Sequence, residues 1–255
     1  MKARFGSRLA IPTAVMLLVT GGVLAKERPP KEPEVEPASI EALKKMGDHL
    51  QSLQNFTIKA DTTSEVVLDD GQKLEIGGEA TYEVKRPDHL RIDLVTDVVH
   101  GELVYDGKTL IYASPDQKTY AQVPAPPTIK ETLERAAQRY NLQFPLADLF
   151  SWGTKDAPID IIREGFFVGH ATVDGNQTDH WAFRGPDQDA EIWIATEGSP
   201  LPLKISLVDR QEDTRPRITT VLHWTENADI PADAFEYKPP EGSAKIGFVG
   251  EETKK

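Results

Sequence analysis

The spacing of apolar side chains changes once along the chain, from the period of a helix to the period of a strand. From Ser39 to Leu53, apolar residues recur every three or four positions, as they do on one face of an α-helix. Ser39 belongs to the residue types that cap helices, so the predicted helix starts there. After Asn55, apolar and polar residues alternate, which predicts strands with one buried face and one face in water.

This alternation continues through most of the chain, interrupted by turns rich in Gly, Asp and Pro. Later strands are expected at 166–173, 178–184, 191–195, 203–208 and 217–225. A meandering antiparallel sheet of about ten strands has to twist and curl. The pattern therefore predicts a mainly β (α+β) fold, in which a curved antiparallel sheet forms an incomplete barrel around two or three helices.

A second helix is predicted in the middle of the chain. Thr128 and Glu131 have the spacing of a capping box, and Asn141 is a residue type that ends helices in the left-handed conformation. The apolar stripe between them consists of Ile129, Leu133, Ala136, Ala137 and Tyr140. A short helical turn is predicted at 145–152. These helices are predicted to pack against the apolar face of the sheet and to bury it.

One short motif, Gly107-Lys108-Thr109, resembles the end of a phosphate-binding loop. Such a loop needs a glycine five residues before Gly107 and a helix after Thr109. The chain has Glu102 where the glycine is needed and the alternation of a strand where the helix is needed, which excludes a phosphate-binding loop. Asp106-Gly107 is instead predicted to be a hairpin turn, because glycine adopts a positive φ without steric cost.

The first 25 residues are typical of a secretory signal. Basic residues precede an apolar run of roughly a dozen residues, which is shorter than the ~20 that span a bilayer. Val23 and Ala25 provide small side chains at the −3 and −1 positions, so cleavage is predicted after Ala25. Residues 26–38, rich in proline and charge, are predicted to be a disordered or extended leader. Residues 39–250 are predicted to form a single half-barrel domain.

Composition narrows the possible functions. The chain has no cysteine, which excludes disulfides, thiol catalysis, thiolate metal sites and a lipid anchor on cysteine. The net charge of −12 becomes −15 after cleavage, because the signal carries three basic and no acidic residues. Such a surface disfavours nucleic acid and anionic membranes. Export without disulfides fits a Gram-negative periplasm, and no transmembrane segment is expected after cleavage.

Short motifs spread along the chain form a set. They are Arg86-Pro87-Asp88-His89-Leu90, Tyr105-Asp106-Gly107, Tyr120 with Pro124-Ala125-Pro126, Phe144-Pro145-Leu146-Ala147-Asp148-Leu149, Asp179-His180, Pro200-Leu201-Pro202, Trp224, Phe235, and Pro239-Pro240 with Gly242. In this order, they resemble the predicted periplasmic proteins grouped as domain of unknown function 2092 (DUF2092). The resemblance implies a fold similar to the lipoprotein carriers of the bacterial envelope (LolA/LolB-like), with an apolar concave side. It implies no biochemical activity.

The chain contains no recognisable catalytic motif, neither a nucleophile elbow nor a His-Glu-x-x-His sequence. The weak candidates for metal ligands are His170 and His180. A three-residue loop at 174–176 would place the two histidines opposite each other, whereas a two-residue loop at 175–176 would put them on opposite faces. No cofactor is expected.

Two functions remain for such a chain. The first is a non-enzymatic periplasmic binding or carrier protein that holds an acyl chain, lipid or lipoprotein segment in an apolar half-barrel cavity. The residues predicted to line the cavity are Ile58, Leu74, Ile76, Tyr82, Ile92 and Leu94 on the strands, and Leu133 and Ala137 on the second helix. The alternative is a structural or sensory envelope module with a packed barrel, whose partner would be an envelope protein.

Overall fold

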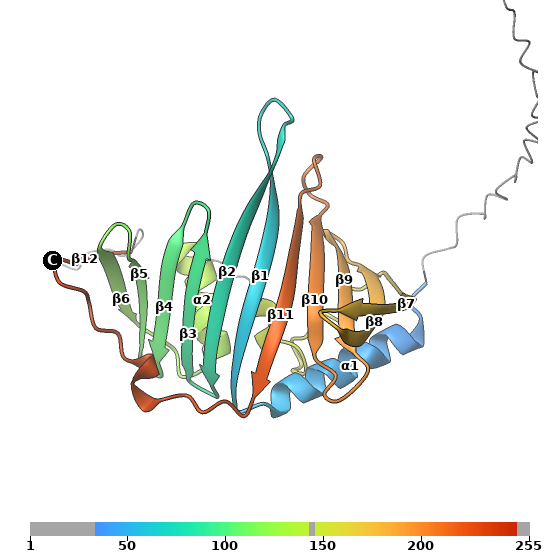
Figure 1. Ribbon diagram of the computed structural model, residues 1–255, viewed down its shortest axis with the longest axis horizontal. Helices are drawn as coiled ribbons and strands as arrows, with labels where there is room; N and C mark the ends of the chain where they lie inside the picture. Colours follow the sequence, from blue (N-terminus) through green and yellow to red (C-terminus); the bar gives the residue numbers. More distant parts are fainter. Residues whose placement is uncertain (1–33, 143–145, 249–255) are drawn as a thin grey trace, which may run out of the picture. The chain divides into compact units, whose positions relative to one another are not determined.

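One open sheet of twelve strands dominates the computed structural model, which describes residues 34–142 and 146–248 (Figure 1). The strands are β1 (Asn55–Val67), β2 (Lys73–Lys85), β3 (His89–Thr96), β4 (His100–Asp106), β5 (Thr109–Ser114), β6 (Thr119–Pro124), β7 (Glu164–Val173), β8 (Asn176–Arg184), β9 (Gln188–Ala195), β10 (Pro202–Asp209), β11 (Arg217–Glu226) and β12 (Ala244–Ile246). All paired neighbours are antiparallel except β12 and β6. The predicted signal, its cleavage site and residues 26–33 of the leader lie outside the described residues.

The sheet consists of two meanders that meet in its middle. Strands β1 to β6 follow one another towards one edge, and β11 back to β7 follow one another towards the other edge. The seam between them is the pairing of β1 with β11, in which Ile58 lies opposite Trp224 and Ala60 opposite Leu222. The predicted mainly β, unclosed sheet is confirmed. The prediction of a single meander is wrong at the seam. The alternation of apolar and polar residues does not determine which strands become neighbours.

Two α-helices and two short 3₁₀ helices accompany the described strands. They are α1 (Pro37–Ser52), α2 (Ile129–Tyr140), η1 (Ala147–Phe150) and η2 (Ala232–Phe235). Leu43 and Met46 of α1 and Leu133 of α2 share one hydrophobic core with the sheet. We call the sheet face that contributes to this core the inner face, and the other the outer face. Within the described ranges, no helix is long and apolar enough to cross a membrane.

The N-terminus of α1 differs from the prediction. The helix begins at Pro37, and its N-cap is Glu36 rather than Ser39. The Ser39 hydroxyl is buried and donates a hydrogen bond to the Glu36 carbonyl. Val35 forms a parallel bridge with Gly165 of β7. The last residues of the predicted leader are therefore ordered, because this pairing satisfies their backbone groups.

The predicted ends of α2 are confirmed. The Thr128 hydroxyl accepts a hydrogen bond from the Glu131 backbone N–H at 3.3 Å and donates one to its carboxylate at 3.0 Å. Asn141 ends the helix in the left-handed conformation, with φ of 53°. Together these caps fix where the chain leaves the sheet at β6 and where it turns back towards β7.

The hairpin predicted at Asp106-Gly107 is confirmed between β4 and β5. Gly107 has φ of 87°, and the Asp106 carboxylate accepts hydrogen bonds from the backbone N–H groups of Lys108 (2.9 Å) and Thr109 (2.7 Å). The Lys108 side chain is exposed. This lysine therefore continues a turn and contributes nothing to a phosphate site.

Replacing Gly107 with alanine is expected to lower the free energy of unfolding by about 1 kcal/mol or more, because alanine is strained at this positive φ. The added Cβ would also lie 3.0 Å from the Asp88 carboxylate. The matched control, Lys108→Ala, should change stability by less than about 0.5 kcal/mol. Urea unfolding measures both. Equal and large losses from the two variants would contradict the turn assignment.

Candidate functional site

An apolar groove of about 510 Å³ lies between the inner face of β8, β9 and β10 and the segment that follows α2. Its floor consists of Phe183, Ala190, Ile192, Ile205 and Leu207. We call residues 146–162 the roof segment, because six of its apolar side chains close the groove from the other side: Leu146, Leu149, Trp152, Pro158, Ile161 and Ile162. Leu43 of α1 adds to the apolar lining.

Strand register produces the floor. Ile192 of β9 lies opposite Ile205 of β10, and Ala190 lies opposite both Phe183 and Leu207. Because directly opposed residues share a face, these side chains all project inward. The single methyl group of Ala190 sits between two larger side chains, which leaves space in the middle of the floor.

Backbone contact with α1 holds the roof segment in place. Gly153 has φ of 78°, and a Cβ atom on it would lie 2.6 Å from the carbonyl carbon of Gly47. A Cβ on Gly47 would in turn lie 2.6 Å from the Gly153 nitrogen. The Gln51 side-chain amide donates a hydrogen bond to the Trp152 carbonyl at 2.7 Å. Two glycines are thus needed where the helix and the roof segment touch.

Arg86 supports the roof segment from the other side. Its guanidinium lies 5.9 Å from the ring centroid of Phe56 and 5.6 Å from that of Phe150, and it donates a hydrogen bond to the Leu50 carbonyl at the end of α1. Burial lowers the pKa of Arg86. This stacking joins η1, and with it the roof segment, to the first strands of the sheet.

The mouth of the groove is polar. Its lining there consists of Asp148, Asp187, Gln188, Asp209 and Gln211. Asp148 belongs to the roof segment, Asp187 to the turn between β8 and β9, and Asp209 to the end of β10. The Asp209 carboxylate also accepts a hydrogen bond from the Gln211 backbone N–H at 2.7 Å. The groove therefore combines apolar walls with an acidic opening.

The residues predicted to line a cavity lie elsewhere, on the other half of the sheet. Ile58, Tyr82 and Ile92 are each 1% exposed within the packed core. Leu133 is buried there too, Leu94 packs against this core, and Ala137 and Ile76 are half-buried. Leu74 is 37% exposed at the far end of β2. None of the eight lines the groove. The groove residues were missed because the roof segment shows no periodicity; its unpatterned apolar residues, such as Ile161 and Ile162, were the available signal.

His170 and His180 do not face each other. The loop between β7 and β8 consists of Asp174 and Gly175, so neither predicted register occurs. His170 instead lies opposite Asp179, with 2.8 Å between Nδ1 and the carboxylate.

His180 is bound into the outer face of the sheet. It contacts the Glu191 carboxylate at 3.0 Å and stacks on Trp193, with ring centroids 4.0 Å apart. Among the residues that the structure describes, no group of three or more His, Asp or Glu side chains could hold a metal ion. The register that would let this pair share a metal ion therefore does not occur.

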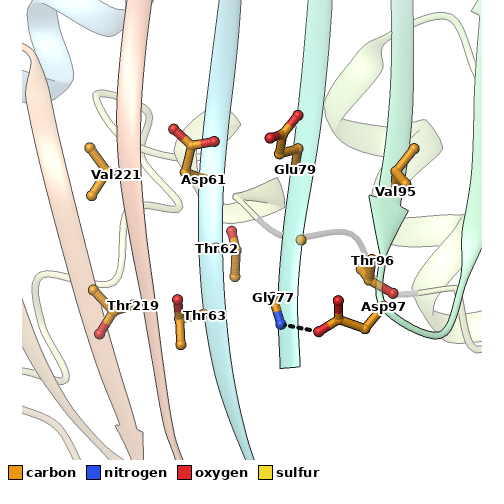
Figure 2. Close-up of a pocket in the computed structure, with 11 residues that line it drawn as sticks. Asp61, Thr62, Thr63, Gly77, Glu79, Val95, Thr96, Asp97, Thr219 and Val221 are labelled. Atoms are coloured by element: carbon orange, nitrogen blue, oxygen red, sulfur yellow. Dashed lines mark hydrogen bonds between the residues drawn. The ribbon is translucent and has the colours of Figure 1, made fainter. Parts of the chain in front are cut away.

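A second depression, of about 620 Å³, lies where β11, β1, β2 and β3 run side by side (Figure 2). Gly77, where an added Cβ would meet only the Asp97 carboxylate at 3.6 Å, lies among its lining residues. The Asp97 carboxylate accepts a hydrogen bond from the Gly77 backbone N–H at 2.7 Å, and Glu79 and Asp61 project from neighbouring positions (Figure 2). This lining of threonines and carboxylates does not suit an apolar ligand.

A family model described as "Predicted periplasmic protein (DUF2092)" matches residues 39–249. This match covers most of the chain and confirms the resemblance seen in the sequence motifs. Its description agrees with the predicted periplasmic location. No curated protein sequence matches the chain.

Several solved structures are similar to the chain. Lipoprotein LppX of Mycobacterium tuberculosis is 15% identical, with 77% of this chain and 100% of that chain covered and a TM-score of 0.48. LprF from Mycobacterium bovis is 12% identical, with 79% and 98% covered and a TM-score of 0.43. A LolA superfamily protein from Nitrosomonas europaea is 10% identical, with 78% and 97% covered and a TM-score of 0.37. None of these scores reaches 0.5, and the fold described above rests on the chain's own strands and helices.

Proposed function

The chain belongs to the DUF2092 family of predicted periplasmic proteins, and on this premise we propose that it is a non-enzymatic binding or carrier protein for an apolar ligand, such as a lipid or the acyl chain of a lipoprotein. The observation that carries the proposal is the groove between the roof segment and β8–β10. Its volume of about 510 Å³ lies within the range of roughly 300–1,000 Å³ that is typical of sites for small molecules.

The walls of the groove suit an alkyl chain. Burial of each methylene group contributes about 0.8 kcal/mol, so a chain of about ten methylenes would gain roughly 8 kcal/mol before the cost of association is subtracted. Side chains such as Trp152, Ile192 and Leu207 offer dispersion contacts along the length of such a chain. Since about 8 kcal/mol corresponds to a Kd of about 1 μM, burial of the alkyl chain alone supports binding no tighter than micromolar.

Contacts within the chain hold the walls of the groove in place, which favours binding. Its floor belongs to three hydrogen-bonded strands, and the roof segment is fixed by the contact of Gly47 with Gly153 and by the stacking of Arg86 on Phe150. A site that is already formed spends little binding free energy on ordering.

The test is to fill the groove. Ala190→Trp would place an indole in the middle of the floor and should weaken the binding of N-phenylnaphthylamine, a neutral apolar fluorophore, at least about tenfold. Fluorescence titration gives the affinity. The matched control is Ala182→Trp, because Ala182 precedes Phe183 on β8 and projects from the outer face. A wild-type protein that binds no fluorophore, or an Ala190→Trp variant that binds it as well as the wild type does, would refute the proposal.

One observation favours the alternative of a packed structural or sensory module. The half of the sheet around Ile58, Tyr82 and Ile92 is closely packed, with each side chain 1% exposed. A failure of the wild-type protein to bind the fluorophore would leave this alternative standing, with an envelope protein as the partner.

A further inference from the structure

We infer that the groove selects apolar ligands whose polar end is cationic or a neutral hydrogen-bond donor, and that it discriminates against anionic ligands such as fatty-acid carboxylates. The inference rests on the proposed function, because it concerns the ligand of the same groove. It adds the chemical class of that ligand's polar end, which the apolar walls alone leave open.

The acidic mouth is assembled from three separate parts of the chain. Asp148 comes from the roof segment, Asp187 from the turn that joins β8 to β9, and Asp209 from the end of β10. In the sheet, Asp209 lies opposite Gln188, so the last two parts meet at the same end of the floor. Gln188 and Gln211 add amide groups, whereas no lysine, arginine or histidine is among the lining residues. An anionic end group would therefore find several carboxylates and no cation in the lining.

Two arginines that lie close in sequence to the lining residues, Arg184 and Arg210, are already engaged in ion pairs. Arg184 donates to the Asp189 carboxylate at 2.7 Å, and Arg210 donates to the Gly185 carbonyl at 3.0 Å while its Nε lies 3.7 Å from the same carboxylate of Asp189. Arg184 also pairs with Glu164 at 3.4 Å, so the two guanidiniums are offset by Asp189 and Glu164, neither of which lines the groove. The negative charges of Asp148 and Asp187 at the mouth remain for the ligand.

Geometry places the polar end of the ligand at these carboxylates. With its alkyl chain against Ile192 and Ile205, an amphiphile has to leave its polar end at the wet opening, because burying that end among the apolar walls would cost its hydration. Each ion pair at a partly exposed position changes affinity by about 1.5- to 5-fold. Three such carboxylates should therefore separate an amine from a carboxylate of equal chain length by about tenfold.

Three ligands with one alkyl chain test this inference: dodecylamine, dodecanol and dodecanoate, each displacing N-phenylnaphthylamine from the wild-type protein at neutral pH and low ionic strength. Dodecylamine should displace the fluorophore at about a tenfold lower concentration than dodecanoate, and dodecanol should lie between or close to the amine. The difference should shrink at high salt, because exposed charges are screened.

Variants locate the effect at the mouth. In the double variant Asp148→Asn with Asp187→Asn, the ratio between amine and carboxylate should fall towards one, and Asp187→Lys should favour dodecanoate. The control is Glu75→Gln with Glu79→Gln, which removes the same net charge from the outer-face positions of β2 and should leave the ratio unchanged. Urea unfolding checks that all variants are folded.

The outcomes separate the two proposals. If the fluorophore binds but dodecylamine and dodecanoate displace it equally well, or if the mouth variant keeps the wild-type ratio, the inference is wrong and the carrier function stands. If the control pair lowers the ratio as much as the mouth variant, the preference comes from the net charge of the protein and the inference is wrong as well. If no fluorophore binds to the wild-type protein, both the function and the inference fall.

Discussion

Replacing Gly153 with alanine is expected to lower the free energy of unfolding by about 3 kcal/mol. Two costs combine at this position. The backbone φ of 78° is strained for any residue with a side chain, and the new Cβ would lie 2.6 Å from the carbonyl carbon of Gly47 in α1. Since neither backbone can move without displacing a packed helix or the roof segment, the clash has no inexpensive relief.

Gly175→Ala separates the two costs. Gly175 has nearly the same φ, 81°, but no atom lies within 4 Å of the Cβ position, so only the strain of about 1 kcal/mol should be lost. Urea unfolding gives both values. If the roof segment yields instead of the helix, Gly153→Ala should also weaken binding of N-phenylnaphthylamine, whereas Gly175→Ala should not. Equal losses of stability from both variants would show that the close contact with Gly47 does not add to the cost of Gly153→Ala.

Ala80→Leu is expected to cost about 2 kcal/mol of stability, because it overpacks the inner face of the sheet. Ala80 is 4% exposed and lies opposite Ala60 on β1 and Leu94 on β3. Its neighbour along the row of inner positions, Gly78, offers no spare room either, since a Cβ there would lie 2.7 Å from the Thr96 methyl group. Small residues in this row therefore fit close neighbours and do not open a cavity.

The control for Ala80→Leu is Ala182→Leu, in which the same side chain is added in the middle of β8 on the outer face. This variant should stay within about 0.5 kcal/mol of the wild type. Thermal or urea unfolding measures both variants. A fully stable Ala80→Leu protein would show that space exists above β2 and would restore the cavity that the sequence predicts on β1, β2 and β3.

The sequence predicts which residues of each strand share the apolar face. It does not predict which part of that face is covered by other elements. Leu74 and Ile76 alternate with polar residues in the same way as Tyr82 and Val84 do on the same strand. Only Tyr82 and Val84 are buried, because the core shared with the helices does not extend along the full length of β2. Alternation identifies which face is apolar, and the reach of the covering elements decides which part of that face is dry.

Contacts between distant parts of the chain were equally hidden from the sequence. Trp224 packs on Phe56 with ring centroids 5.8 Å apart and donates a hydrogen bond to the Pro202 carbonyl at 2.8 Å. The contact of Gly47 with Gly153 is of the same kind. Local periodicity carries no information about such pairs, so the seam and the groove could be found only in the structure, whereas the caps of α2 and the turn at Gly107 are local and were predicted correctly.

The seam between β1 and β11 has a consequence for how an exported chain becomes a finished protein. Translocation delivers the N-terminal side first, so β1 can pair with β2 early but must wait for β11, almost the last long segment to arrive. Until then the half of the sheet made of β1 to β6 ends in an unpaired edge at β1, which is a template for association with other chains. Non-local strand pairing of this kind also makes maturation slow. We therefore expect the chain to associate through this edge more readily before β11 has paired than after it.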